Sequence, residues 1–193
     1  MIHESAPWKA HLIRDAHLIE RWAAKPKNLE RRSFLIERKV FLAAYAMRKL
    51  DEGLKLSTDL LTADMTVLRF PPTQDGFTLR NNHRFDEHFD LENPQRVSLP
   101  RRRVLNLLVH SLVFVEVLND IETYDAFMVT SDYERGQGLV QIDIAAFVEL
   151  MRLVGGDWPT SLRWVREPTG SGWRVWAGHG EGPDVAQTGR KVR

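Results

Sequence analysis

The stretch from Pro100 to Ser111 holds residue types that could do chemistry together. On a helix, Arg103, Asn106 and His110 would form a polar stripe on an otherwise apolar rod, with Arg103 and His110 within about 20° of each other. An imidazole exchanges protons near neutral pH, and a guanidinium holds phosphate through its fork of donors. We therefore take His110 as a candidate base, Arg103 as a candidate phosphate ligand and Asn106 as a group that orients the substrate.

The spacing of Arg103 and His110 resembles the R-x6-H motif of the HEPN superfamily of metal-independent ribonucleases and toxins, over about ten residues. In that family an amide often follows the arginine, whereas Val104 does so here and Asn106 comes one turn later. The resemblance implies an RNA-cleaving toxin or defence protein whose site forms across a homodimer, paired through the N-terminal helices. The whole chain also resembles short uncharacterised bacterial proteins with a helical hairpin before an Asn-x-x-x-His-Ser segment, which implies a shared scaffold without a particular activity.

A structural interpretation of the same stripe stays open. An amphipathic helix needs a polar face, and a histidine near a helix C-terminus interacts favourably with the last carbonyl groups. Under this interpretation the chain is a non-enzymatic regulatory module that binds a protein or a nucleic acid. The sequence alone leaves open whether the protein is an enzyme.

A second candidate site lies near the C-terminus, where aromatic and basic residues alternate: Arg163, Trp164, Arg166, Trp173, Arg174 and Trp176. Aromatic rings stack on bases and guanidinium groups bind phosphates, so this pattern is typical of a single-strand platform. The candidate nucleic-acid-binding residues, with two from the arginine run, are Arg101, Arg102, Trp164, Arg166 and Arg174. Alternation puts Trp173 and Trp176 on opposite faces, so one tryptophan would serve packing instead.

A third cluster combines imidazoles and carboxylates, which suit zinc, manganese or iron: His83, Asp86, His88 and Asp90. The rest of the chain offers no partner at the spacing of a metal site. We interpret the cluster as part of a solvated loop, with a metal site as the open alternative. No metal and no cofactor are expected.

Composition narrows the class of protein. The 193 residues are 43% hydrophobic and 27% charged and contain no cysteine, which excludes disulfides, thiolate metal sites and thiol catalysis. The sequence has neither the roughly 20 apolar residues of a membrane span nor a signal peptide, so we expect a cytoplasmic protein that contacts no membrane. Residues 1–56 carry a net charge of +5 and residues 161–193 a net charge of +3. Residues 57–160, between them, carry a net charge of −7. This division indicates internal complementarity as readily as a nucleic-acid surface.

Hydrophobic periodicity predicts an α+β fold: a long N-terminal helical hairpin, then a small, mostly antiparallel sheet with two further helices. The hairpin comprises helices over residues 7–24 and 29–56, with residues 40–47 apolar or small and therefore expected to be buried on all sides. We predict one domain over residues 1–177 and a disordered tail over residues 178–193.

The remaining elements follow from turn and capping residues. Ser98 should cap a third helix and Asp143 a fourth, which Gly155 and Gly156 would end. Strands are predicted at residues 66–70, 112–118, 124–130 and 139–142, and residues 161–167 and 173–177 should form a hairpin around a turn at 168–172. Residues 71–97 should form a long surface loop.

Overall fold

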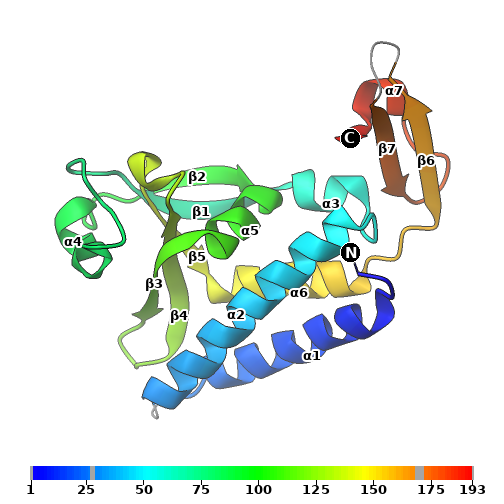
Figure 1. Ribbon diagram of the computed structural model, residues 1–193. Coiled ribbons are helices and arrows are strands. Elements are labelled where there is room, and N and C mark those ends of the chain that lie inside the picture. Colours follow the sequence, from blue (N-terminus) through cyan, green and yellow to red (C-terminus); the bar gives the residue numbers. More distant parts are fainter. Residues whose placement is uncertain (1, 27–28, 168–171, 193) are drawn as a thin grey trace.

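The computed structural model describes residues 2–26, 29–167 and 172–192 of the chain and confirms the α+β class (Figure 1). Four helices of nine or more residues pack together: α1 (Ala6–Ala23), α2 (Leu29–Glu52), α5 (Arg101–Val109) and α6 (Ile144–Gly156). Three shorter helices lie in the connections: α3 (Thr58–Thr62), α4 (Phe85–His88) and α7 (Val185–Thr188). None of the described helices has both the length and the apolar composition needed to cross a membrane.

The strands form two separate antiparallel sheets. The larger has the order β2-β1-β5-β4-β3, with β1 (Asp64–Phe70), β2 (Gln95–Pro100), β3 (Ser111–Leu118), β4 (Tyr124–Ser131) and β5 (Leu139–Asp143). The smaller has the order β6-β7-β8, with β6 (Ser161–Arg166), β7 (Trp173–Gly178) and β8 (Arg190–Val192). It lies at the upper right of Figure 1, on the opposite side of the molecule from α4.

The main core lies between the larger sheet and the helices. Phe41 of α2 contacts Phe114 of β3, which stacks on Phe127 of β4 at 5.1 Å between ring centroids. Phe127 in turn meets the ring of Phe147 of α6 edge-on at 5.6 Å. Such offset and edge-on pairs add to the energy of burying the rings. One line of aromatic rings therefore fixes α2 and α6 against the sheet.

Asp143 caps α6 as predicted, because its Oδ1 accepts hydrogen bonds from the backbone amides of Ala145 and Ala146. Helix α2 differs from expectation at two places. It ends at Glu52, and Leu54 follows with a φ of +57°, in the left-handed region that terminates helices. Leu42 and Tyr45 are about half exposed, at 53% and 49%, so the expectation that residues 40–47 are buried on all sides is wrong.

Ser98 does not cap a helix. It lies in β2, where it pairs with Thr66 of β1 and donates a hydrogen bond to Asp64. The helix begins three residues later, after Pro100. Proline is suited to this junction because it has no backbone N–H, and an N–H at the start of a helix has no partner within the helix. The preceding segment also has more structure than a surface loop: a small second hydrophobic cluster joins it to the sheet, formed by Phe70, Phe77, Phe89 and Leu139.

The expected disordered tail contains α7 and β8 instead. Asp184 caps α7 by accepting a hydrogen bond from the amide of Ala186, and Val185 is buried. Strand β8 pairs with β7, which places Arg190 opposite Val175. The predicted turn at residues 168–172 and the end of the tail at residue 193 fall largely outside the described residues, which resume at Gly172 and stop at 192.

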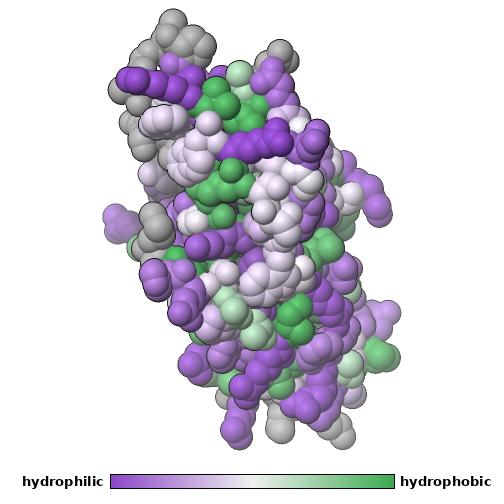
Figure 2. Space-filling model, turned by 90° about the vertical axis from the view of Figure 1, so that its right-hand side faces the viewer, coloured by the Kyte–Doolittle hydropathy of each residue, from purple (hydrophilic) through white to green (hydrophobic). Residues whose placement is uncertain are grey.

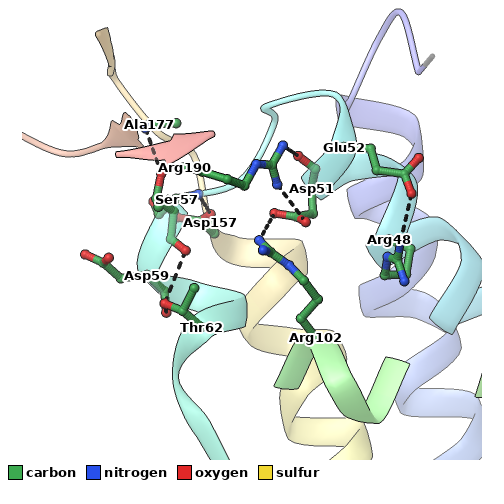
Figure 3. Close-up of polar contacts among 11 residues, drawn as sticks. Arg48, Asp51, Glu52, Ser57, Asp59, Thr62, Arg102, Asp157, Ala177 and Arg190 are labelled. Atoms are coloured by element: carbon green, nitrogen blue, oxygen red, sulfur yellow. Dashed lines mark hydrogen bonds and ion pairs between the residues drawn. The ribbon is translucent and has the colours of Figure 1, made fainter. Parts of the chain in front are cut away.

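The smaller sheet contributes no residue to the main hydrophobic cluster among the described residues, and polar contacts attach it. Asp51 at the end of α2 is 5% exposed, and its carboxylate contacts Arg102 of α5 at 3.0 Å and Arg190 of β8 at 2.9 Å (Figure 3). Arg190 also donates to the backbone carbonyl of Asp51, and the amide of Ala177 donates to Thr58. A buried carboxylate shared by two guanidinium groups therefore joins the smaller sheet, through β8, to α2 and α5.

Lys9 makes a second buried junction beside the first. Its ammonium group donates to the carbonyls of Lys55 and Asp157 and lies 4.3 Å from the ring centroid of Trp158. Burial lowers the pKa of Lys9, and the nearby Asp157 carboxylate opposes that shift. Asp157 itself binds the amide and the hydroxyl of Ser57 (Figure 3). The two lysine hydrogen bonds tie α1 to the ends of α2 and α6.

We predict that Asp51→Ala lowers the free energy of unfolding by about 3 kcal/mol, because it leaves two partly buried guanidinium groups facing each other without a counter-charge. Glu52→Ala is the matched control, since Glu52 makes only exposed ion pairs with Arg48 and Lys49 and should change stability by at most about 0.5 kcal/mol. Urea unfolding of both variants measures the difference. Equal losses would show that Asp51 does not hold the junction.

Candidate functional site

Helix α5 forms as predicted, but Arg103 is bound within the protein. Its Nε donates to both carboxylate oxygens of Glu134, at 2.7 and 2.9 Å, and its Nη2 donates to Glu134 and Gln137 at 2.5 Å each. Glu134 and Gln137 come from the turn that follows β4. A forked contact of this kind is the strong form of an arginine–carboxylate pair.

The electrostatics of Arg103 match this geometry. Hydrogen bonding to Glu134 raises the pKa of Arg103 above its ordinary value, while partial burial opposes the shift. A phosphate at this guanidinium would have to displace a carboxylate that is already bound. The predicted phosphate ligand is therefore charge-compensated by Glu134, a turn residue that belongs to none of the three candidate sites.

The other two residues of the stripe have different surroundings. Asn106 is half-buried, and its side-chain oxygen is enclosed without a hydrogen-bond partner among the described residues. His110 follows the last turn of α5, where its amide donates to the carbonyl of Asn106. Its imidazole is exposed and meets the ring of Tyr133 edge-on, at 6.3 Å between centroids. The structure thus presents the imidazole to solvent beside a tyrosine and not beside a free cation.

Three of the five candidate nucleic-acid-binding residues are also engaged internally. Arg101 donates to the carbonyl of Leu60, and Arg102 binds Asp51. Arg174 contacts Glu167 at 3.3 Å and the carbonyl of Gly189 at 3.5 Å. These three arginines connect elements of the fold, and all three are half-buried.

Trp164 and Arg166 are exposed, on the outer strand of the smaller sheet. Register places Arg166 opposite Trp173, and the rings of Trp164 and Trp173 meet edge-on at 6.4 Å between centroids. The two rings are 45% and 44% exposed. Figure 2, which looks onto this end of the molecule, shows small hydrophobic patches beside strongly hydrophilic ones, most clearly in its upper part. The hairpin therefore displays a ring pair and a guanidinium on one face.

Trp176 lies on the opposite face and serves packing, as the alternation of the strand suggests. It is 4% exposed, and its ring lies close to Gly178 and Gly182, where a Cβ would come within 2.4 and 2.5 Å of ring atoms. Glycine is required at both positions because any larger residue would displace the ring. Of the two tryptophans of β7, Trp176 therefore packs inside the protein and Trp173 is exposed.

The histidine–aspartate cluster does not converge on one point. His88 is buried with its Nε2 3.0 Å from the Asn81 amide nitrogen, whereas Asp90 accepts hydrogen bonds from the amides of Glu92 and Asn93. Within the described part of the chain, no three His, Asp or Glu side chains are grouped so that they could hold a metal ion.

Comparisons with protein families, with curated proteins and with solved structures find no match to this chain. The geometry of its own residues is therefore the basis for inferring its function.

If Arg103 serves to connect α5 to the turn after β4, its energy should be coupled to that of Glu134. We expect a double-mutant cycle of Arg103→Ala and Glu134→Ala to give a coupling energy of about 1 kcal/mol at low salt, which high salt reduces. Urea unfolding of the two single variants and the double variant measures this coupling. Additive losses would mean that the pair does not form in solution and that Arg103 is available to a ligand.

Proposed function

We propose that this protein is a non-enzymatic binding module that takes up single-stranded nucleic acid on the hairpin formed by β6 and β7. The observation that carries the proposal is the exposed pair of Trp164 and Trp173 with Arg166 on the same face. Indole rings stack on bases of any sequence, and a neighbouring guanidinium binds the phosphate between them. An exposed pair of tryptophans beside a cation is also the kind of apolar surface patch that marks an interaction site.

The charges around the hairpin support the same proposal. Arg163 and Arg166 are exposed and make no hydrogen bond or ion pair with any described residue. Glu167 is the acidic residue nearest to them in the chain, and hydrogen bonds from Lys191 and Arg174 hold its pKa below the ordinary value. A phosphate chain on the face of Trp164 and Trp173 therefore meets Arg166, unpaired in the described part of the chain, whereas Arg163 lies on the opposite face, across from Trp176. Such contacts make affinity depend strongly on salt.

We expect Trp164→Ala and Trp173→Ala each to weaken binding of a fluorescent oligouridylate about 5- to 100-fold, because each variant removes one stacking surface. Trp8→Ala is the matched control, since Trp8 is similarly exposed at 42% but lies on α1. Fluorescence anisotropy at several salt concentrations measures affinity and its salt dependence together. Failure of the wild type to bind the oligonucleotide at low salt, or equal losses in all three variants, would refute the proposal.

Ribonuclease activity is a second candidate, favoured by one observation: His110 is exposed at the C-terminal end of the helix that carries Arg103. If His110 acts as a base, single-stranded RNA should be cut in the presence of a chelator, and His110→Ala should abolish the cutting. His17→Ala, at an exposed histidine of α1, is the control. Intact RNA after incubation with the wild type would rule out the ribonuclease candidate, and only the binding proposal would remain.

A further inference from the structure

The edge of the larger sheet at β3 is open to pairing. All eight residues of β3 are half-buried, and β4 is their hydrogen-bonding neighbour on one side only. Natural edge strands are usually protected by lysine, proline or a charge that points outward. The opposite edge, β2, has Arg96 and Pro100, but β3 reads Ser-Leu-Val-Phe-Val-Glu-Val-Leu. Its one charge, Glu116, accepts a hydrogen bond from Ser33 of α2 and so turns toward the helices.

The open part of β3 is a short regular stretch that is bounded at both ends. Asn82 donates to the carbonyl of Leu112 at 2.7 Å, which closes one end of the edge. The pairing with β4 is irregular between Ser111 and Val113 and again between Val117 and Leu118. Residues 113–117 remain as a regular five-residue stretch with Val115 at its centre.

We infer that this edge joins two copies of the chain, with β3 of one copy antiparallel to β3 of the other about a two-fold axis at Val115. This register places Val113 opposite Val117 of the second copy, and Phe114 opposite Glu116 of the second copy. No two glutamates then face each other directly, and the two five-stranded sheets become continuous. An axis of this kind makes the interface self-complementary, as a closed dimer requires.

Helix α2 carries a pattern that fits the same axis. Glu37 lines a groove of about 390 Å³ together with residues of β3 up to Val115, so the middle of α2 lies beside the middle of the strand. A two-fold axis between Glu37 and Arg38 would bring Glu37 to Arg38 of the second copy. It would also bring Phe34, which is 59% exposed, to Phe41 of the second copy. Both sets of contacts are complementary, in charge and in apolar character.

The charged pair supports a second copy over another partner. Glu37 and Arg38 are both exposed, and neither makes an ion pair with any described residue. Adjacent opposite charges on one helix satisfy each other across a two-fold axis, whereas an unrelated peptide would have to supply both signs at the same spacing. The inference is independent of nucleic-acid binding, because the β6–β7 hairpin lies on the other side of the molecule (Figure 1).

Charge reversal on α2 tests the inference without disturbing the core. We expect the wild type to sediment as a dimer, and Arg38→Glu to raise the dissociation constant at least about 10-fold, because four carboxylates then meet at the axis. The double variant Glu37→Arg, Arg38→Glu exchanges the two charges and should restore dimerisation to within about threefold of the wild type. Arg14→Glu, at an exposed arginine of α1, is the matched control and should leave the dimer unchanged.

Hydrogen exchange provides a second readout. In the dimer, every amide from Val113 to Val117 should be protected, whereas in dissociated Arg38→Glu the outward amides should exchange at least about 10-fold faster. A monomeric wild type at high micromolar concentration would overturn the inference and leave the edge for another partner. So would a dimer that Arg38→Glu does not weaken, or a double variant that is not restored.

Discussion

The carboxylate of Asp51 is the constraint on which the arrangement of this molecule depends. It is buried, and burying a carboxylate is costly unless opposite charges and hydrogen bonds surround it. Arg102 and Arg190 meet that requirement from α5 and β8. The smaller sheet adds nothing to the main hydrophobic cluster in the described residues, and this charged contact and the Thr58–Ala177 hydrogen bond are among the contacts that link it to the helices. Charged and polar contacts thus link the smaller sheet to the helices that pack on the larger one, beside the burial of Val175, Trp176 and Ala177 in β7.

The same logic explains why the run of three arginines at the start of α5 is not a ready phosphate site. Arg101 binds the carbonyl of Leu60, Arg102 binds Asp51, and Arg103 binds Glu134. Each guanidinium connects α5 to a different neighbour, so the run functions as a joint between layers. The arginines of β6 have no such partners in the described chain. Among the arginines that the sequence singled out, Arg163 and Arg166 of β6 are therefore accessible to a ligand, whereas the three arginines of α5 are bound within the protein.

The elements were predictable to the extent that local pattern determines them. The existence of α2, the cap at Asp143 and the position of β4 follow from residues that are close together in the chain. The role of Arg103 was not predictable, because its partner Glu134 lies 31 residues away in a turn without a distinctive signal. Leu42 and Tyr45 look like core residues in sequence, but the helices around α2 cover only part of its circumference. The order of the segment around Arg190 was not predictable either, because its contact with Asp51 spans 139 residues of the chain.

The distance in sequence between Asp51 and its second arginine also affects how the protein is made. Arg190 comes 139 residues after Asp51. At about 5–20 residues per second, a ribosome needs roughly 7 to 28 s to synthesise that interval. During this time α2 can form, and Arg102 can reach the carboxylate, but the charge at Asp51 is only half compensated. The helical layer of a nascent chain is thus least stable while its sheets are still being completed, which is when a chaperone or a protease would find it most accessible.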